Sequence, residues 1–574
     1  YNRCYDIQQE AASGDITLLP QKTNLIYQTS LIYCFNDEQS LYYIDKEFNF
    51  YAFHIPTQKN EFIANLGKEI QERGKISSIV HYHNSYFVGF LMDGILLLEK
   101  QKETNHYQIQ SLPINSGVFC LKKDRFQDVV WIGTDGQGVY LYSNPLYSIK
   151  SMVLSNYTEK IERPVRAIYL DDERTFWVGT KGNGILKIYD YEFDKNISDC
   201  RAEVLTTSNS ALSSNAVYCF AKSHRNLLWI GDEEGLTYYS YREKRIKSIP
   251  IRIGNEDFKY IHDIYETADS ELWLVSVGMG VVKARIAGTP DNPVIVDAQR
   301  YIINDGELGS NYFFTIYAEN EANLLFGNKG YGVFRYNETT NGLEPVSTHK
   351  YENMTLNNIL AISKDSSNNY LFGTSYGLIK YTSETSYQLF NAKNGFLNNT
   401  IHAILRNSSD DFWLSTNLGL INFDTKRNVF RSYGFGDGLK VVEFSDGAAF
   451  RDSQTGTLFF GGINGVVAIR ADGRPEQLYM PPVYFDKLSI FGEQYNLGEF
   501  LTRKKETEVL NLQYDQNFFS VSFASVDYLN GNNCTYFYKL KGLSDQWVNN
   551  GSESGVSFTN MAPGEYTLLV KYYN

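Results

Sequence analysis

A motif that recurs about every 46 residues constrains this chain more than any other feature. It reads aromatic, apolar, glycine, then threonine or aspartate, followed by a turn that ends in glycine and by an alternating strand. The copy WIGTDGQGVYLY, which begins at Trp131, is one of the clearest. Internal repetition at such a period determines the architecture of the whole chain. The copies begin near Tyr33 and at Phe87, Trp131, Trp177, Trp229, Trp273, Leu325, Leu371, Trp413 and Phe459.

Each repeat has the pattern of a four-stranded β unit. The motif itself contains two alternating segments joined by a tight turn, which is typical of a hairpin. Another alternating run precedes the motif, as in residues 166–173, and another follows it, as in residues 386–393. Four short strands in about 45 residues match one blade of a β-propeller. A helical solenoid would need amphipathic runs of about 10–15 residues, which the sequence lacks. We therefore predict an all-β fold.

The motif residues have structural roles in this prediction. The aromatic residue would begin the second strand of a blade and pack between neighbouring blades. At the position two residues later, a side chain would clash with the next blade, so glycine is expected there. The glycine that ends the turn would supply a positive φ. The first set comprises Gly133, Gly179, Gly231, Gly327, Gly373 and Gly461, and the second comprises Gly138, Gly184, Gly235, Gly332, Gly377 and Gly419.

Ten copies exceed one ring, because propellers usually close with about four to eight blades. We expect residues 1–160 to form part of a first β-propeller that is incomplete here. Residues 161–478 would form a second, seven-bladed β-propeller, with the position of its seam open by a strand or two. The pattern changes at Pro481-Pro482. Residues 481–574 alternate as strands without the glycine turn, which predicts an Ig-like β-sandwich that is truncated at its C-terminus.

Composition narrows the possible functions. A net charge of −13 and a pI near 5.3 oppose direct contact with nucleic acid, which needs a concentrated positive field. No apolar run reaches the roughly 18 residues of a membrane helix. The N-terminus has no signal peptide pattern and begins inside a worn repeat, as expected for a processed or truncated fragment. The six cysteines show no metal-binding spacing. Cys120 and Cys219 hold nearly the same place in two repeats, and we predict that both are small buried core residues.

Several longer segments resemble a known family. They are EFSDGAAFRDSQTGTLFFGGINGVVAI, the double-proline junction, QNFFSVSFASVDY, YFYKLKGLSDQW and APGEYTLLVKYYN. The repeat resembles the two-component-regulator propeller repeat, and residues 481–574 resemble the Tyr-rich sandwich domain that follows such propellers. The chain is thus similar to the periplasmic sensor region of a hybrid two-component system of gut Bacteroidetes.

The resemblance implies a larger protein. In that family two seven-bladed propellers and the sandwich precede a membrane helix, a cytoplasmic histidine kinase, a receiver and a DNA-binding domain. Such proteins detect oligosaccharides from glycan breakdown and switch on the matching utilisation genes. The resemblance therefore implies a periplasmic region of a protein anchored in the inner membrane. The kinase, receiver and DNA-binding parts are not in this sequence, and about three to four blades of the first propeller are also expected to be missing.

The sequence offers no catalytic or metal-binding motif. GTDGQG and GTKGNG are similar to phosphate-binding loops, but a strand follows them where such loops need a helix. His81 and His83 could share a strand face, yet no third metal ligand is evident nearby. There is no Ser-His-Asp order and no HExxH. We expect no catalytic residue, no metal and no cofactor, although a pair of carboxylates that meet only in three dimensions stays open.

Carbohydrate recognition needs aromatic faces and planar polar groups. Propellers place ligands in loops around the channel mouth or at a domain interface, so the loops that enter the first strand of each blade contain our candidates. The alternative is that they are ordinary polar residues at blade edges. Two of the arginines would favour an acidic sugar. The candidates are Arg163, Arg166, Tyr260, His262, Asn311, Tyr312, Asn399, His402 and Glu443.

The leading hypothesis is a sensor that binds a glycan fragment and transmits a rearrangement through the sandwich. Because a ligand must favour one arrangement to signal, we predict a homodimer with ligand contacts near a mobile interface. The alternatives are a propeller polysaccharide lyase or glycoside hydrolase, and a protein-interaction scaffold. In the sandwich, Tyr528, Tyr536, Tyr538 and Trp547 are expected to be core and strand-pairing residues with a mechanical role.

Overall fold

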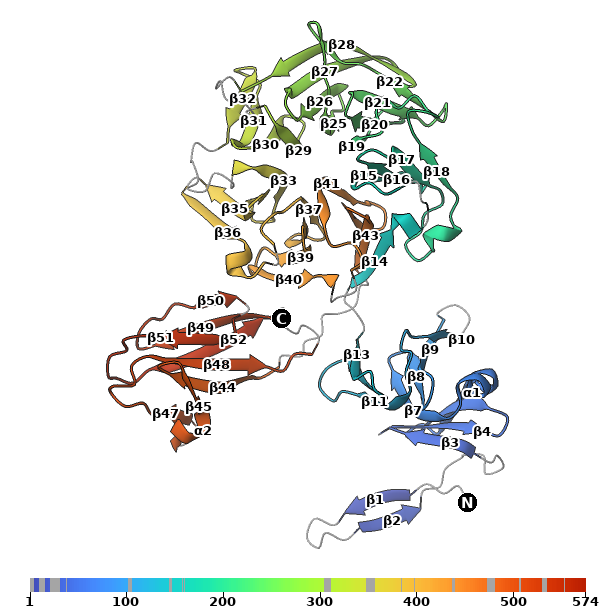
Figure 1. The fold of residues 1–574 in the computed structure, drawn as a ribbon, viewed down its shortest axis with the longest axis vertical. Helices are drawn as coiled ribbons and strands as arrows, with labels where there is room; N and C mark the ends of the chain where they lie inside the picture. Colours follow the sequence, from blue (N-terminus) through green and yellow to red (C-terminus); the bar gives the residue numbers. More distant parts are fainter. Residues whose placement is uncertain are drawn as a thin grey trace. The chain divides into compact units, whose positions relative to one another are not determined.

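The computed structural model is almost entirely β-structure in two compact units (Figure 1). The first unit comprises Tyr1–Pro145, Pro475–Pro481 and Asp527–Leu529, and the second comprises Leu146–Arg474, Pro482–Val526 and Asn530–Asn574. The structure describes residues 5–9, 16–20, 31–37, 39–101, 106–143, 147–156, 158, 161–303, 311–346, 357–383, 385–396, 398–435, 439–471, 481–504, 507–528, 534–551 and 553–573.

The first unit contains three blade-like antiparallel sheets. Its first sheet consists of β3 (Leu31–Asn36), β4 (Ser40–Asp45), β5 (Asn49–His54) and β6 (Lys59–Asn65). Its second consists of β7 (Ile76–Tyr82), β8 (Ser85–Phe90), β9 (Ile95–Lys100) and β10 (Tyr107–Ser111), and its third of β11 (Val118–Lys123), β12 (Val129–Thr134) and β13 (Val139–Ser143). The unit also has a hairpin of β1 (Tyr5–Gln9) and β2 (Ile16–Pro20), and the helix α1 (Gly67–Arg73).

The second unit contains a ring of seven four-stranded sheets, and their innermost strands surround its centre in Figure 1. The innermost strands are β15 (Val165–Leu170), β19 (Val217–Lys222), β25 (Ile261–Glu266), β29 (Phe313–Asn320), β33 (Ile359–Lys364), β37 (Ala403–Arg406) and β41 (Phe444–Arg451). The second strands are β16 (Phe176–Thr180), β20 (Leu227–Asp232), β26 (Glu271–Ser276), β30 (Asn323–Asn328), β34 (Tyr370–Thr374), β38 (Asp411–Thr416) and β42 (Leu458–Gly462).

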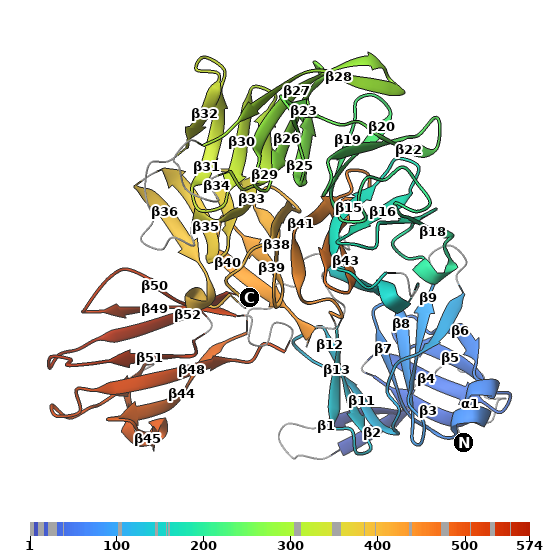
Figure 2. The ribbon, with the colours of Figure 1, turned by 45° about the horizontal axis from the view of Figure 1, so that its top comes forward.

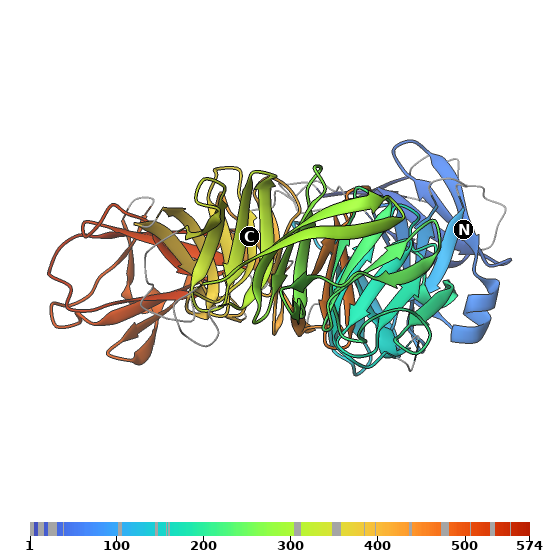
Figure 3. The same cartoon turned by 90° about the horizontal axis from the view of Figure 1, so that it is seen from above.

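The outer half of each blade follows in the same order, and Figures 2 and 3 show these strands from other sides. The third strands are β17 (Ile185–Ile188), β21 (Leu236–Ser240), β27 (Gly280–Thr289), β31 (Gly332–Asn337), β35 (Gly377–Ser383), β39 (Gly419–Asp424) and β43 (Gly465–Ala471). The outermost strands are β18 (Ala202–Leu205), β22 (Arg245–Ser248), β28 (Asn292–Tyr301), β32 (Gly342–Pro345), β36 (Ser386–Phe390), β40 (Val429–Tyr433) and β14 (Tyr147–Val153). A short hairpin of β23 (Arg252–Ile253) and β24 (Glu256–Asp257) follows the second blade.

The ring closes by joining distant parts of the chain. Strand β41 lies beside both β37 and β15, so the last blade meets the first. Strand β14 pairs with β43 over the whole of Tyr147–Val153 and becomes the outermost strand of the last blade. The last blade therefore takes three strands from residues 444–471 and one from residues 147–153. The confirmed fold class is all-β, with a seven-bladed propeller followed by a sandwich.

The motif residues fill the seams between blades. Trp177, Trp229 and Trp413 have no exposed surface, and Trp273 is 2% exposed. Trp177 packs with Val217 of the next blade. A Cβ added to Gly179 would lie 2.7 Å from Val217 Cγ1, closer than two carbon atoms can approach. The predicted roles of the motif tryptophan and of the first glycine are thus confirmed in the ring.

The second glycine of the motif has the predicted backbone conformation. Gly184 and Gly377 have φ values of 77° and 147°, and a Cβ on either would lie within 2.4 Å of a backbone carbonyl oxygen. Residues other than glycine rarely adopt such φ values. The hairpin between the second and third strands therefore requires glycine at this position.

The prediction for the two aligned cysteines was right for one of them. Cys219 is buried at 8% exposure, whereas Cys120 is exposed. The Sγ atom of Cys219 lies against the neighbouring blade, with Ile261 O at 3.6 Å. Cys120 lies in β11, which has β7 beside it. Cys120 remains exposed because no sheet in the described part of the first unit covers its side of β11.

The C-terminal residues form the sandwich. One sheet has the strand order β45 (Glu493–Asn496), β44 (Val483–Ile490), β48 (Phe519–Ser525) and β51 (Gly555–Phe558), and the other has the order β50 (Val548–Gly551), β49 (Thr535–Lys541) and β52 (Thr567–Tyr573). A hairpin of β46 (Leu501–Lys504) and β47 (Thr507–Leu510) and the helix α2 (Leu497–Phe500) complete this region. Its core includes Phe523, Tyr536, Leu540 and Phe558.

The expectation of four aromatic core residues in the sandwich was only partly right. Tyr536 is buried, and Tyr538 packs against the same core from β49. Trp547 is 40% exposed, because it precedes the edge strand β50 and stacks on Lys539 and Lys571. Tyr528 is 43% exposed, because it follows the end of β48 and lies outside the strands.

Candidate functional site

The innermost strand of the blades has an irregularity at one recurring position. In β15 the pairing passes from Val165–Thr180 directly to Ala167–Gly179, so that Arg166 is an extra residue in the strand. Such a β-bulge redirects the side chain that it carries. The same bulge occurs in β19, β25, β29 and β33. The bulged residues of these four strands are Tyr218, His262, Phe314 and Leu360.

The two remaining blades place polar residues at the corresponding position. His402 directly precedes β37, and its backbone N–H donates to Ser415 O at 2.8 Å. Asp446 lies in a longer irregularity of β41, where the pairing passes from Phe444–Gly462 to Ala449–Phe460. We call these seven residues the central cluster. It comprises Arg166, Tyr218, His262, Phe314, Leu360, His402 and Asp446.

Aromatic contacts connect the cluster across successive blades. The rings of Tyr218 and His262 stack with their centroids 4.5 Å apart and an interplanar angle of 17°. Phe314 meets His262 edge-on at 5.5 Å. The guanidinium carbon of Arg166 lies 5.9 Å from the centroid of the Tyr218 ring. Four neighbouring blades thus contribute to one continuous set of planar groups.

Charged contacts connect the other side of the cluster. Asp446 Oδ1 lies 2.5 Å from His402 Nδ1, and Asp446 Oδ2 lies 3.6 Å from Arg166 Nη1. Because a carboxylate only accepts hydrogen bonds, His402 Nδ1 carries a hydrogen. The other ring nitrogen of His402 lies 2.7 Å from Asn417 Oδ1. Arg166 Nε is buried and has no hydrogen-bond partner among the described residues.

The surroundings give the cluster members different charges. Burial, together with the nearby Arg166, lowers the pKa of His262 to about 3, so this imidazole is neutral near neutral pH. Burial alone would raise the pKa of Asp446. The hydrogen bond from His402 and the positive charge of Arg166 contribute to outweighing burial and keep the pKa of Asp446 below its usual value. The cluster therefore combines a carboxylate, a guanidinium and a neutral imidazole.

The structure brings three of the nine candidates together in this cluster, namely Arg166, His262 and His402. Two others organise loops. The side-chain oxygen of Asn311 accepts a hydrogen bond from the backbone N–H of Ile303 at 2.7 Å. The backbone carbonyl of Asn311 accepts hydrogen bonds from the N–H groups of Gly278 and Gly280. Asn399 accepts the backbone N–H of Ala392 at 2.8 Å. For these two asparagines the geometry matches the alternative of ordinary residues at blade edges.

The other four candidates lie in the same loops and are not part of the cluster. The Tyr312 ring packs over Gly278, where a Cβ would lie 3.1 Å from the ring. Tyr260 is 42% exposed and has a φ of 55°. Arg163 and Glu443 are exposed. A ligand-binding role for any of the nine residues stays a prediction.

Four cluster members were absent from the sequence candidates, namely Tyr218, Phe314, Leu360 and Asp446. A signal for the first three was present. In the first six blades the residue that belongs to the central cluster precedes the third motif position by 13 residues, as Arg166 precedes Gly179 and Tyr218 precedes Gly231. Aligning the repeats on that glycine would have identified these positions. Asp446 breaks this spacing, because the irregularity in β41 is longer.

The two histidines considered as a metal pair have separate partners. The His81 ring lies 4.7 Å from the Tyr86 ring, and His83 is hydrogen-bonded to Asp128. In the described ranges no three side chains of histidine, cysteine, aspartate or glutamate are grouped as a metal site would require. The helices that the structure describes include none long and apolar enough to cross a membrane.

Comparisons with known proteins agree with the fold. Residues 527–574 match the Y_Y_Y domain family. Histidine kinase P4 of Formosa agariphila is 25% identical over 430 residues, which cover 71% of this chain and 30% of that protein. The chain therefore spans less than a third of the length of this curated relative.

One solved structure matches almost the whole chain. It is the extracellular domain of a putative hybrid two-component system from B. thetaiotaomicron, with a TM-score of 0.57, 23% sequence identity, and coverage of 99% of this chain and 79% of that chain. This match shows a shared fold. The resemblance inferred from the sequence is confirmed: the chain is similar to the extracellular region of a Bacteroidetes hybrid two-component system, with propeller repeats followed by a Y_Y_Y domain.

Proposed function

We propose that this chain is the sensor region of a hybrid two-component histidine kinase and binds an oligosaccharide from glycan breakdown. It would act in the periplasm as part of a protein anchored in the inner membrane and would regulate polysaccharide-utilisation genes. The similarity to the extracellular domain of a putative hybrid two-component system and to histidine kinase P4 supports the sensor role. The ligand class is supported by the chemistry of the central cluster.

The observation that carries the ligand proposal is the meeting of flat aromatic and planar polar groups from different blades. Sugar rings pack an apolar face on aromatic rings, and their hydroxyls pair with guanidinium and carboxylate groups. Tyr218 and His262 supply a stacked pair, and Arg166 and Asp446 supply the polar groups beside it. The ion pair with Asp446 fixes the Arg166 guanidinium beside the aromatic pair.

The proposed signal requires a change in the arrangement of parts of the protein. A ligand shifts an equilibrium only by its difference in affinity for the two states. A change from 1:99 to 99:1 requires about 5.5 kcal/mol of such difference. Contacts that span two bodies supply this more readily than contacts inside one rigid ring. We therefore retain a homodimer with ligand contacts near a mobile interface as part of the proposal.

Calorimetric titration with a panel of neutral and acidic oligosaccharides tests the site. Arg166→Met should weaken binding of the recognised oligosaccharide at least tenfold, because it removes the guanidinium and keeps the aliphatic stem. Arg163→Met tests the other predicted arginine, which is exposed, lies three residues earlier and is not part of the central cluster. Equal affinity of both variants and the wild type would place the ligand elsewhere. Absence of binding by any oligosaccharide would contradict the proposal.

A propeller polysaccharide lyase or glycoside hydrolase is the second candidate function. The observation in its favour is the hydrogen bond between His402 and Asp446 beside Arg166, since an oriented imidazole can transfer protons. An enzyme would release reducing ends from a glycan panel, and His402→Gln would abolish the release. A sensor binds the same glycans without releasing reducing ends.

A further inference from the structure

Three blades of the ring have a lysine at one position of the third strand. Lys187 pairs with Trp177, Lys283 with Trp273, and Lys380 with Leu371, and in each pair the partner is the aromatic or apolar residue that opens the motif. Each ammonium group reaches the following blade. Lys187 contacts Tyr239, Lys283 contacts Tyr336, and Lys380 donates to Thr425 O at 2.6 Å.

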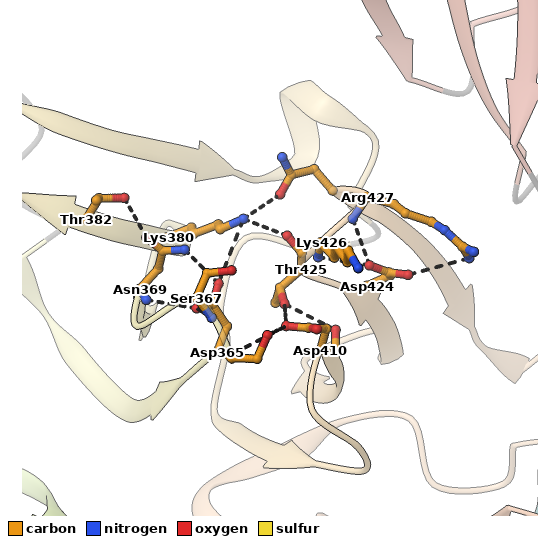
Figure 4. Close-up of polar contacts among 12 residues, drawn as sticks. Asp365, Ser367, Asn369, Lys380, Thr382, Asp410, Asp424, Thr425, Lys426 and Arg427 are labelled. Carbon is orange, nitrogen blue, oxygen red and sulfur yellow. Dashed lines mark hydrogen bonds and ion pairs between the residues drawn. The ribbon is translucent and has the colours of Figure 1, made fainter.

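Two of these lysines have an anionic partner. Lys283 Nζ lies 2.9 Å from Glu271 Oε1. Lys380 Nζ lies 3.9 Å from Asp365 Oδ2 and donates to Asn428 Oδ1 at 3.1 Å (Figure 4). Asp365 is itself held in place by the backbone N–H group of Asn369 at 2.8 Å. The cationic charge is therefore balanced within the ring at both positions.

Lys187 lacks such a partner. It is 4% exposed, and no carboxylate in the described ranges forms an ion pair with it. Its ammonium nitrogen lies between three aromatic rings, 4.5 Å from the centroids of Trp177 and Tyr239 and 4.8 Å from that of Tyr189. It donates only a long hydrogen bond, 3.3 Å, to the Tyr239 hydroxyl.

The carboxylate of the first blade that corresponds to Asp365 has a different partner. Asp171 and Asp365 hold the same position, six residues before Trp177 and Leu371 respectively. In the first blade the indole N–H of Trp177 donates to Asp171 Oδ2 at 2.9 Å. Leu371 has no such donor, so Asp365 remains available to Lys380. In the first blade Asp171 is thus hydrogen-bonded to Trp177 and forms no ion pair with Lys187.

Lys187 lines a groove between the first two blades of the ring. The groove has a volume of about 900 Å³, which is within the range of small-molecule sites. Tyr189 and Tyr239 contribute aromatic surface, and Arg201 stacks on Tyr189 with its guanidinium carbon 4.6 Å from the ring centroid. Of the acidic residues in the groove, Glu203 accepts the Tyr189 hydroxyl at 2.7 Å and Glu173 is exposed.

We propose that this groove binds an anionic saccharide, whose carboxylate or sulfate group supplies the counter-ion that Lys187 lacks. A buried cation without a counter-ion is unfavourable, so an anion that reaches it gains attraction without displacing an existing ion pair. The aromatic rings around Lys187 provide faces for a sugar ring. The saccharide part of this inference rests on the proposed function, whereas the anion part rests on the environment of Lys187.

Burial lowers the pKa of Lys187, and Glu203 and Asp171 only partly oppose this effect. The direction agrees with an ammonium group that is not balanced by a contacting carboxylate. Arg201 at the edge of the groove would provide a second, exposed cation for the same anionic group. Because guanidinium pairs bidentately with carboxylate and sulfate, both anions suit this edge.

Titration calorimetry on the whole chain tests the site with four probes: a uronic-acid disaccharide, a sulfated disaccharide, a neutral disaccharide and inorganic sulfate. At least one anionic disaccharide should bind the wild type tenfold or more tighter than the neutral one. Lys187→Met should remove this advantage, because methionine retains packing among the three rings without the charge. Lys283→Met is the matched control and should leave the affinity unchanged.

Further outcomes separate this inference from the proposed function. Loss of binding in Lys187→Met but not in Arg166→Met supports the groove, and the reverse contradicts it while supporting the central cluster. Equal affinity for inorganic sulfate and the anionic disaccharides would overturn the saccharide assignment. Arg201→Ala should weaken binding severalfold, and it changes an exposed residue, so a folding defect cannot explain the result. Near-ultraviolet circular dichroism of each variant checks the packing of the aromatic residues.

Discussion

Two hairpins built from the same motif have different environments in this protein. The segment WIGTDGQGVYLY forms β12 and β13 of the first unit, and WIGDEEGLTYYSY forms β20 and β21 of the ring. In the ring hairpin, Leu236 is 2% exposed and Tyr238 is 4% exposed. In the first unit, Val139 is 68% exposed and Leu141 is 36% exposed. The motif therefore builds the hairpin, whereas the next blade provides the burial.

Replacing the tryptophan that opens each hairpin should give the largest difference in stability between the two hairpins. Trp229 has no exposed surface and donates its indole N–H to Glu266 of the next blade at 2.7 Å. Replacing it by alanine should cost about 3–5 kcal/mol, because a large cavity forms and Glu266 loses its donor. Trp131→Ala should cost clearly less, since Trp131 is only half-buried. Hydrogen exchange measured by mass spectrometry reports the two hairpins separately. Equal loss of protection in both would contradict the comparison.

The motif glycine gives a finer test of the same difference. A Cβ at Gly231 would lie 2.8 Å from Ile261 Cγ2 and 2.9 Å from Ile261 O, both in the next blade. Gly231→Ala should therefore destabilise β20 by about 1–3 kcal/mol. A Cβ at Gly133 would meet one side-chain atom, Cys120 Sγ, at 2.8 Å. Gly133→Ala should have a smaller effect, and the effect should disappear in Gly133→Ala combined with Cys120→Ala. Hydrogen exchange of β12 and β20 decides between these outcomes.

The bulge position predicts a pH effect that is confined to the ring. This position is occupied by His262 in β25 of the ring and by Phe119 in β11 of the first unit. Of these two side chains, only the imidazole titrates. The pKa of His262 is about 3 in the folded state and near 6.5 in the unfolded chain, so the unfolded state takes up the proton first. The stabilisation is present above about pH 6.5 and is lost as the pH falls towards 3. Between about pH 7 and pH 5 the loss should be about 1–2 kcal/mol.

The variant His262→Phe checks this assignment, since it places in the ring the residue type found in β11. Urea unfolding of the wild type should shift to lower urea between about pH 7 and pH 5, and the variant should shift less. If both lose the same stability, groups other than His262 determine the acid sensitivity.

The smallest effect is expected at the open edge of the first unit. Val139 holds the position of Leu236, since the two pair with Gly133 and Gly231 respectively. Because Val139 is mostly exposed, Val139→Thr should change the stability by less than about 0.5 kcal/mol. Its visible effect should be reduced self-association, measured by sedimentation velocity at increasing concentration. A loss of several kcal/mol would show that this strand is covered in solution.

The repeat made most of the ring predictable. The part of the site that could be predicted was found from the position of polar residues in the loops that enter the innermost strands. Arg166, His262 and His402 were found because polar residues at the start of innermost strands were considered as ligand contacts. Tyr218 and Phe314 were passed over because aromatic residues in a strand are usually core residues. Asp446 was missed because the irregularity in β41 changes its spacing from the motif. Cys120 was assigned to the core because it holds nearly the same place in its repeat as Cys219, but only Cys219 is covered by a neighbouring blade.

The sequence alone determined the blade, because alternation, the motif tryptophan and the two glycines act through contacts within about 45 residues or with the adjacent repeat. Only the tertiary structure decided which residues meet across blades. The pairing of β14 with β43 and the ion pair between Arg166 and Asp446 join residues that are between 280 and 324 positions apart. Lys187 shows the same limit, because its position is visible in the sequence, whereas the folded structure determines that three aromatic rings, and no contacting carboxylate of the described residues, surround its ammonium group. Charge balance inside a ring depends on distances between blades, and a linear pattern does not contain them.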